Sequence, residues 1–463
     1  MSVYQPCDIR GPVADLSTSL YRRWGEALGR QVPRGETMVV GGDRRPSTPD
    51  FKQALLEGLL ESDIEVADLG IVPTPMVYFA RRATRAAGCA IVTASHNPPG
   101  VNGLKWLVGE LPPTEDDVEQ LREEAELADH RVGFPIRGSK ISLDVTGEYS
   151  NWIAATYQRA SDLADLTIVL DPKNGCWAER ARLILARLFP KAQVQAIHDR
   201  PDGRFPEGNA DCSRTRHLLA LSRAVQDRGA AVGIAFDGDG DRVAFVDATG
   251  RALRAEETTW VLLQSFGDTL CDQAFVYDCK FSDRIPEGAA QLGATPLVER
   301  SGHAFIRRRM LESQALFGAE ISGHYFYRAL RGGDDGLFTA CRMIQRIVLI
   351  HATLADLRES CPAIYMTPDL RLIVKPDQRD QIIEQLQIAF GRYPQTRIDG
   401  VRVDFPDGWG LVRRSVTDSR QLTFRFEGRD RKSLAAVVRR FRDGMPAFGD
   451  RLYEAYASNA PEA

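Results

Sequence analysis

The sequence predicts an α/β protein whose first part consists of successive units of alternating strand and helix and whose last part is a smaller α+β domain. The chain has 463 residues, more than one core usually organises. Up to Pro362, short apolar runs alternate with segments of helical period, the pattern of βαβ units with a largely parallel sheet. Beyond that residue, strands at hairpin spacing with few helices indicate antiparallel pairing.

The first domain is expected over residues 1–140. A strand-like run at residues 38–40 is followed by a loop and then by apolar residues of helical period at residues 51–60. A second apolar run, residues 89–92, leads into a loop that ends at Lys105. A capped helix then completes the unit.

The second and third domains are expected over residues 141–249 and 250–362. The second opens with the apolar run 166–171 and returns through the run 231–235. The third contains strand-like segments and closes with a long helix at residues 336–350. Alternation of strand and helix in both predicts further βα units.

The fourth domain is expected over residues 363–463. Its short strands are separated by turn-like segments, with one helix inside at residues 381–390 and one at the end at residues 433–442. The predicted strands are 370–374, 401–403, 410–413 and 422–426.

Bulk properties exclude several classes of protein. A formal net charge of −4 argues against nucleic acid as the main partner. No stretch is long and apolar enough to cross a bilayer, and the start of the chain lacks the features of a signal peptide, so we expect a cytoplasmic protein that does not act at a membrane. The eight cysteines are scattered, which predicts reduced and mostly buried thiols.

An acidic, glycine-rich stretch follows the apolar run 231–235. It is Phe-Asp-Gly-Asp-Gly-Asp-Arg, residues 236–242. Open α/β sheets place ligands beyond the carboxyl ends of their strands. Three aspartates separated by glycines can direct three oxygen ligands to one point, which suits Mg²⁺ with a phosphate completing its shell. A solvated acidic turn is the alternative, which we consider weaker because the stretch directly follows a buried strand and ends in arginine.

A second stretch, Val-Thr-Ala-Ser-His-Asn-Pro-Pro at residues 92–99, also follows an apolar run. Ser95 stands at the strand end beside a histidine, in a turn stiffened by proline, as a nucleophile or phosphate carrier would. An ordinary turn fits these residue types equally well when the stretch is considered alone.

Together the two stretches resemble the α-D-phosphohexomutase family, whose members move a phosphoryl group between the C1 and C6 oxygens of a hexose. Further segments match family motifs in family order, so the resemblance covers nearly the whole chain. They are residues 7–11, 102–105, 301–303, 318–324 and 413–417. The resemblance implies three similar mixed-sheet α/β domains and a smaller C-terminal α+β domain around a central cleft.

The resemblance also implies a reaction. Ser95 would carry the phosphoryl group, and Mg²⁺ would be held by Ser95, Asp237, Asp239 and Asp241. A hexose 1-phosphate and a hexose 6-phosphate would interconvert through a phosphoserine enzyme and a hexose 1,6-bisphosphate that reorients in the cleft. Such a reaction requires mainly alignment and charge neutralisation from the protein.

Proton transfer requires titratable groups beside the reacting oxygen. The resemblance places Lys105, Arg10 and His324 in these duties, with Arg242 in the same catalytic set. A lysine is a poor base unless burial or nearby cations lower its pKa, and we expect the arginines around Lys105 to do so. The alternatives are a surface lysine for Lys105 and a hydrogen-bonded core histidine for His324.

A further set of residues is expected to bind the hexose phosphate. Glu320 and Ser322 are two residues apart and face the same way in an extended segment, where the family contacts the hexose 3- and 4-hydroxyls. Alternate residues of the 413–417 segment can bind the phosphate that does not react. The full expected set is Lys280, His303, Glu320, Ser322, Arg413, Ser415 and Thr417.

The chain departs from the family pattern at three places. Cys7 stands where the family usually has an aromatic residue, and Val416 and Ser419 stand where asparagine and proline are typical. Residues 208–212 replace a His-x-Pro-x-Pro segment. We expect these changes to alter substrate affinity and range more than the chemistry.

The leading interpretation is a Mg²⁺-dependent phosphoglucomutase/phosphomannomutase. Ile321 resembles the methionine of the dual-specificity members more than the glutamine of phosphoglucosamine mutases, so glucose and mannose phosphates are expected as substrates. The alternatives are a phosphoglucosamine mutase, a non-catalytic sugar-phosphate-binding protein, and a phosphatase that uses Asp237 as nucleophile.

Overall fold

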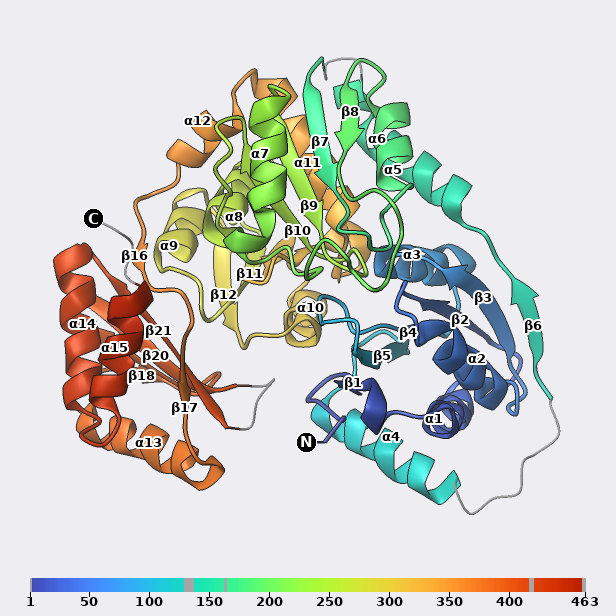
Figure 1. Ribbon diagram of the computed structural model, residues 1–463, viewed down its shortest axis with the longest axis horizontal. Helices are drawn as coiled ribbons and strands as arrows, with labels where there is room; N and C mark the ends of the chain where they lie inside the picture. The colour runs from blue at the N-terminus through green and yellow to red at the C-terminus, as the bar shows by residue number, and fades with distance from the viewer. Residues whose placement is uncertain (1, 129–136, 162–164, 416–419, 460–463) are drawn as a thin grey trace.

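The chain forms four α/β units arranged in an arc (Figure 1). The computed structural model describes residues 2–128, 137–161, 165–415 and 420–459. Each unit contains one sheet, and we call them the first to fourth units in chain order. In Figure 1 the first unit is blue to teal, the second is green, the third runs from yellow-green to orange, and the fourth is orange to red.

The first unit is built on a six-stranded mixed sheet of order β1-β5-β4-β2-β3-β6. Strand β5 is antiparallel to both neighbours, while the other pairs are parallel. The strands are β1 (Ile9–Pro12), β2 (Thr37–Gly42), β3 (Glu65–Ile71), β4 (Gly88–Val92), β5 (Val101–Val108) and β6 (Ser139–Ser142). The helices are α1 (Thr18–Gln31), α2 (Thr48–Leu59), α3 (Thr74–Thr84) and α4 (Glu115–Ala128).

The second unit has a four-stranded mixed sheet of order β10-β9-β7-β8. Its strands are β7 (Thr167–Asp171), β8 (Gln193–Ala196), β9 (Val232–Phe236) and β10 (Val243–Asp247). Its helices are α5 (Thr146–Ser161), α6 (Ala181–Leu188) and α7 (Leu219–Asp227).

The third unit has a five-stranded mixed sheet of order β12-β11-β13-β14-β15. Its strands are β11 (Ala274–Asp278), β12 (Thr295–Glu299), β13 (Phe317–Ala319), β14 (Tyr325–Tyr327) and β15 (Gly333–Asp334). Its helices are α8 (Ala255–Gln264), α9 (Arg284–Gln291), α10 (His303–Glu312), α11 (Gly336–Ile350) and α12 (Leu354–Glu359). Short 3₁₀ helices in the described chain are η1 (Val13–Asp15), η2 (Thr215–Leu218), η3 (Gly267–Leu270) and η4 (Arg328–Leu330).

The fourth unit pairs its strands antiparallel throughout the described residues, as the hairpin spacing predicts. The strands are β16 (Tyr365–Met366), β17 (Leu370–Ile373), β18 (Gln395–Thr396), β19 (Val401–Phe405), β20 (Gly408–Arg414) and β21 (Gln421–Gly428). The helices are α13 (Pro376–Ala389), α14 (Arg431–Asp443) and α15 (Gly449–Asn459). The predicted fold class, three mixed α/β units followed by a smaller sheet-rich unit, is confirmed.

One predicted helix start and one predicted domain limit differ from the structure. Helix α13 begins at Pro376 rather than residue 381, because a proline fits the first turn of a helix, where its missing N–H is not needed. Strand β6 carries the first sheet past the limit predicted at residue 140. The four domain limits themselves stay predictions.

Apolar packing joins the first three units. One continuous cluster of buried side chains runs from Val39 in the first unit through Trp177 in the second to Phe275 in the third. The fourth unit has a separate core that includes Phe424 and Phe441. The first three units therefore share a core, from which the core of the fourth unit is separate.

The fourth unit meets the third mainly through polar contacts. Arg425 donates to Glu256 at 2.8 Å, and Arg402 pairs with Asp283 at 2.7 Å. A small apolar cluster of Cys279, Trp409 and Leu411 lies beside them.

All eight cysteines are free thiols, five of them buried, which confirms the prediction of mostly buried, unpaired cysteines. Among the described helices, none combines the length and apolar character that a membrane span requires.

Candidate active site

A cavity of about 880 Å³ lies where the four units meet. Each unit contributes lining residues, among them His96, Arg242, Lys280 and Arg413. A second cavity of about 370 Å³ shares His96, Arg242 and Glu320 with the first and reaches Ser95. This is the central cleft that the resemblance implies.

The acidic stretch lies beyond the carboxyl end of β9, as predicted, and turns back into β10. Gly238 is required there because a Cβ at this position would lie 2.6 Å from the carbonyl oxygen of Ser95. Gly240 has a φ of 82° and packs against Trp177, whose indole N–H donates to the Gly240 carbonyl at 2.8 Å. The acidic loop therefore packs closely against the loop that carries Ser95, here called the serine loop, and the hydrogen bond from Trp177 fixes its backbone.

The three aspartates of this loop fit a cation. One carboxylate oxygen from each of Asp237, Asp239 and Asp241 lies within 4.8 Å of the others, and all three side chains are buried. Asp239 Oδ1 and Asp241 Oδ1 are buried without a hydrogen-bond partner. Burial, and then the neighbouring aspartates, raise the pKa of Asp237 well above its ordinary value. A bound cation would relieve this excess of buried negative charge, so the donor set is a candidate metal centre.

Lys105 bridges two of these aspartates. Its Nζ donates to Asp239 Oδ2 at 2.9 Å and to Asp241 Oδ2 at 2.7 Å, so Lys105 does not bind the Oδ1 atom of either aspartate. Burial lowers the pKa of Lys105, but Asp239 and Asp241 outweigh it and raise the pKa well above its ordinary value. The expected lowering by arginines is therefore wrong: the nearest charges are carboxylates, and Lys105 is held as an ammonium ion.

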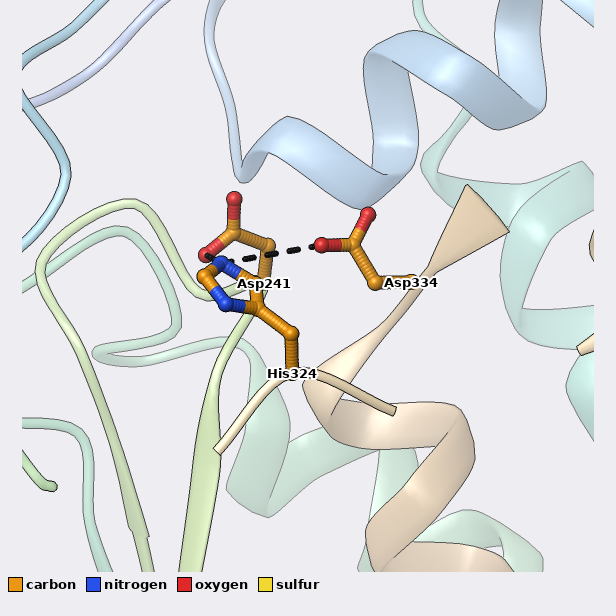
Figure 2. Close-up of side chains that lie close together, drawn as sticks. All are labelled: Asp241, His324 and Asp334. Atoms are coloured by element: carbon orange, nitrogen blue, oxygen red, sulfur yellow. Dashed lines mark ion pairs between the residues drawn. The ribbon is translucent and has the colours of Figure 1, made fainter. Parts of the chain in front are cut away.

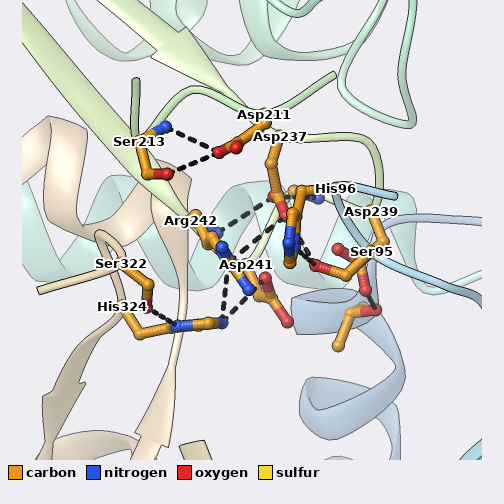
Figure 3. A network of polar contacts seen from close by, with 12 residues as sticks. Ser95, His96, Asp211, Ser213, Asp237, Asp239, Asp241, Arg242, Ser322 and His324 are labelled. Atoms are coloured by element: carbon orange, nitrogen blue, oxygen red, sulfur yellow. Dashed lines mark hydrogen bonds and ion pairs between the residues drawn. The ribbon is translucent and has the colours of Figure 1, made fainter. Parts of the chain in front are cut away.

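Ser95 lies against the acidic loop (Figure 3). Its Oγ donates to Asp237 Oδ2 at 2.8 Å and lies 3.4 Å from His96 Nδ1. Burial, and then the charge of Arg242, hold the pKa of His96 well below its ordinary value. The serine thus meets a carboxylate of the candidate metal centre and a neutral imidazole.

His324 is surrounded by acidic groups (Figure 2). Its Nε2 lies 3.3 Å from Asp241 Oδ1 and 3.7 Å from Asp334 Oδ2, and its Nδ1 lies 3.1 Å from Glu320 Oε2. Burial and Arg242 lower the pKa of His324, but Asp241 and Glu320 outweigh them and raise it to about 10. His324 is therefore an imidazolium at neutral pH.

The two predicted catalytic arginines reach the same region. Arg242 Nε lies 3.7 Å from Asp237 Oδ2 and 3.4 Å from His324 Nε2. Arg10 pairs with Asp8 at 2.6 Å and lines the cavity that contains Ser95. All five residues of the predicted catalytic set therefore gather around this cavity and the acidic loop.

The segment after β13 is a turn rather than an extended strand. The Glu320 amide donates to the His324 carbonyl at 3.0 Å, and Gly323 has a φ of 94°. Glu320 and Ser322 nevertheless converge, since both reach His324 Nδ1, and both line the main cavity. The ring of His303 stacks on that of His324 with centroids 6.0 Å apart.

Other residues expected to bind the substrate also line the main cavity. Arg413 pairs with Asp399 at 3.0 Å, and Lys280 lies 3.7 Å from Asp278. Ser415 also lines the cavity. Thr417, and the departures at Val416 and Ser419, lie outside the described residues.

The other departures from the family pattern border the cavities. Cys7 lines the cavity near Ser95, and burial raises the pKa of its thiol far above the neutral range. Asp211 and Cys212, in the replaced segment, line the main cavity. These positions are where a substrate would be contacted.

Three residues of the site escaped sequence reasoning. Thr74 donates its hydroxyl to Asp239 Oδ2 at 2.8 Å. His96 was noted only as a neighbour of Ser95, and Asp334 precedes a helix and there resembles a capping residue. For Asp334, a useful signal was the doubled aspartate, since only Asp335 caps α11.

Three family models match the chain. They describe the α/β/α domains I, II and III of phosphoglucomutase/phosphomannomutase and match residues 5–130, 148–250 and 256–365. Together they cover most of the chain and coincide with the first three units.

Curated relatives match nearly the full length. A phosphomannomutase/phosphoglucomutase of Pseudomonas aeruginosa is 32% identical over 457 residues, 97% of each chain. A phosphoglucomutase of Neisseria gonorrhoeae is 28% identical over 95% of this chain and 96% of its own. The crystal structure of a phosphoglucomutase/phosphomannomutase family protein from Burkholderia thailandensis is 28% identical, covers 100% of this chain and 98% of its own, and superposes with a TM-score of 0.84. The chain belongs to the phosphoglucomutase/phosphomannomutase group of the α-D-phosphohexomutase family.

Proposed function

We propose that the protein is a Mg²⁺-dependent phosphoglucomutase/phosphomannomutase that interconverts hexose 1-phosphates and 6-phosphates. The contact of 2.8 Å between Ser95 Oγ and Asp237, inside the group of three buried aspartates, carries the proposal. It places a hydroxyl that can take a phosphoryl group beside ligands for a cation, at the edge of a cleft large enough for a hexose bisphosphate. The cytoplasmic location expected from the sequence stays a prediction.

The metal ligands would be Asp237, Asp239 and Asp241, with an oxygen of phosphorylated Ser95. Bound there, Mg²⁺ would withdraw charge from the phosphoryl group in transfer. Lys105 would orient two of the aspartates by binding their Oδ2 atoms, and Asp239 Oδ1 and Asp241 Oδ1 would remain for the cation.

Proton transfer would involve His324, which lines the same cavity as Ser95. As an imidazolium it can give a proton to a departing oxygen in one half-reaction, and the neutral imidazole that this leaves can take a proton from an attacking hydroxyl in the other, since the two halves run in opposite directions. Lys105 and Arg10 add positive charge around the oxygens that become anionic.

The distal phosphate would be held by the fourth unit. Arg413 now pairs with Asp399, and a phosphate can replace this carboxylate because guanidinium binds both groups through the same pair of N–H donors. Glu320 and Ser322, from the third unit, would bind the sugar hydroxyls between the two phosphates. In this arrangement a hexose 1,6-bisphosphate spans the cleft and can reorient within it.

Intact-mass measurement of the purified protein tests the proposal. We expect one phosphoryl group on Ser95 after treatment with glucose 1,6-bisphosphate, and its loss when excess glucose 1-phosphate or mannose 1-phosphate is added. Protein that never acquires this mass would instead indicate a sugar-phosphate-binding protein without turnover.

Ser95→Ala separates the mutase from a phosphatase that uses Asp237 as nucleophile. We expect the variant to lose at least about a thousandfold in kcat, because the phosphoryl carrier is gone. Full hydrolysis of hexose phosphates by the variant would support the phosphatase.

A further inference from the structure

Arg45 is fully buried in the connection between β2 and α2, and its guanidinium donates hydrogen bonds to the serine loop. Its Nη2 donates to the carbonyls of Ser95 at 2.8 Å and Asn97 at 2.5 Å. Its Nη1 donates to the carbonyls of Pro98 at 2.5 Å and Val101 at 3.0 Å. One side chain thus satisfies four carbonyls within seven consecutive residues, which no other residue type could do with one planar fork.

Asp43 completes this arrangement from the other side. Its Oδ2 accepts from Arg45 Nε at 2.9 Å and from the Thr93 hydroxyl at 2.8 Å. The Thr93 hydroxyl in turn accepts from the Ser95 amide at 2.8 Å. The loop backbone at Ser95 is therefore held at both its N–H and its carbonyl, and both holds lead back to the Asp43–Arg45 pair.

Ser95 needs such support because its φ is 51°, in the left-handed region that a residue with a side chain adopts at a cost. A strained conformation of this kind persists only when its surroundings determine it. The direction of the Ser95 hydroxyl toward Asp237 depends on this conformation.

The same guanidinium connects the serine loop to the acidic loop of the second unit. The ring of Phe205 lies 5.3 Å from the Arg45 guanidinium carbon. Phe205 and the Ser95 carbonyl both pack against Gly238, where a Cβ would lie 3.3 Å and 2.6 Å from them. A shift of Arg45 would therefore change the separation of the serine from the aspartates.

We infer that Arg45 is a positioning residue of the phosphoryl-transfer centre, which sets the conformation of residues 95–101 and thereby the place of Ser95 Oγ against Asp237. The inference rests on the proposed function in so far as Ser95 carries the phosphoryl group. Arg45 itself touches neither the hydroxyl nor the aspartates of the acidic loop.

The test is Arg45→Lys, which keeps the charge but cannot reach four carbonyls. We expect kcat to fall about a hundredfold and KM for glucose 1-phosphate to stay within about threefold, since misplacement of a reacting group by 1 Å has effects of this size. Hydrogen exchange of residues 95–101, followed by mass spectrometry, should become faster, while exchange in β9 stays unchanged.

Arg81→Lys is the matched control. Arg81 is a buried arginine of the same unit that donates to the carbonyl of Gly109, away from the serine loop. We expect it to lower thermal stability without the selective loss of kcat or the faster exchange of the loop.

Unchanged kcat and unchanged loop exchange in Arg45→Lys would overturn the inference. If Arg45→Lys does not fold, Phe205→Leu replaces it in the test. Because this variant loses the ring that packs on the guanidinium, we expect kcat to fall about fivefold and hydrogen exchange of residues 95–101 to become faster. Unchanged kcat and unchanged exchange in Phe205→Leu would also overturn the inference. Failure of the proposed function would be seen in a different measurement, as wild-type protein that acquires no phosphate on Ser95. In that case the comparison of hydrogen exchange between wild type and variant still tests the role of Arg45.

Discussion

The proposed centre of phosphoryl transfer and the fourth unit are attached to the molecule in different ways. Ser95 and the acidic loop stand on units that share one apolar core, and a hydrogen bond joins the buried side chains of Ser95 and Asp237. The fourth unit has its own core and meets the third through ion pairs such as that of Arg425 with Glu256. Polar interfaces of this kind separate more readily than shared cores.

The difference suggests a division of labour. Phosphoryl transfer needs reacting groups fixed within fractions of an ångström, which a continuous core can provide. In the proposed reaction a sugar bisphosphate turns between two half-reactions, which requires one end of its site to be released and bound again. On this view Arg413 and Ser415 stand on the part of the molecule suited to that adjustment, and the following predictions probe each side.

Among the predictions that follow, Asp239→Asn, a change in the proposed phosphoryl-transfer centre, should have the largest effect. The amide removes a negative charge from the group of three aspartates, so we expect Mg²⁺ affinity to fall about tenfold to a hundredfold by calorimetry, with a similar loss of kcat at low Mg²⁺. Asp247→Asn, a buried aspartate of the same unit outside that group, should leave Mg²⁺ affinity unchanged. Equal affinity in Asp239→Asn would remove Asp239 from the metal centre.

Much of the proposed phosphoryl-transfer centre can be predicted from the sequence, because its motifs are short and continuous in the chain. Asp237, Asp239 and Asp241 are spaced within five residues, and Ser95 follows a recognisable strand. The contact between Thr74 and Asp239 could not be predicted, since 165 residues separate them and a lone threonine at the start of a helix has many uses.

Charge balance was harder still to predict. The arginines near Lys105 are evident in the sequence, but the sign of its pKa shift depends on which charges lie closest, and the structure shows two aspartates within 3 Å. Likewise, nothing local in the sequence shows that the four carbonyls of residues 95–101 all face Arg45.

Arg425→Met tests the attachment of the fourth unit. It leaves Glu256 and Asp369 without the guanidinium that now lies 2.8 and 3.2 Å from them, and uncompensated buried charge of this kind costs about 3 kcal/mol. We expect KM for glucose 1-phosphate to rise about tenfold with a smaller change in kcat.

Arg440→Met is the control for this change, because Arg440 pairs with Asp407 inside the fourth unit. It should leave KM unchanged. A loss of kcat in Arg425→Met at constant KM would mean that the interface supports the reacting centre, and the division of labour would be wrong.

Substrate preference tests the sugar side of the cleft. Apart from Glu320, the carboxylates that line the main cavity pair with arginines: Asp211 with Arg214, and Glu256 and Asp369 with Arg425. Few acceptors are therefore left for a 2-ammonium group. We expect kcat/KM for glucose 1-phosphate and mannose 1-phosphate to agree within about tenfold and glucosamine 1-phosphate to be poorer than both. A preference for glucosamine 1-phosphate would favour a phosphoglucosamine mutase.

The smallest effect expected is a dependence of stability on pH that arises in the second unit. His198 Nδ1 lies 2.9 Å from Asp171 Oδ1, and the His198 carbonyl accepts from the Asn174 amide, next to the turn that packs on the acidic loop. The hydrogen bond to Asp171 raises the pKa of His198 above its ordinary value of 6.5.

Because this folded-state pKa is raised, the stabilisation by His198 is complete below pH 6.5 and is lost as the pH rises through the raised value. His324, with its pKa raised to about 10, acts in the same direction over a wider range, so the wild type alone cannot separate the two. We therefore compare the wild type with His198→Gln: the difference in melting temperature should be larger at pH 6 than at pH 8.5. The fourth unit contains no histidine and serves as the internal control. Its unfolding is followed by hydrogen exchange in β21, and the difference between wild type and His198→Gln in this exchange should be the same at pH 6 and pH 8.5. A difference in melting temperature that does not change with pH would show that the His198–Asp171 pair stabilises the second unit by packing alone, and the contrast between the two sides of the molecule would then rest on the core and the ion pairs.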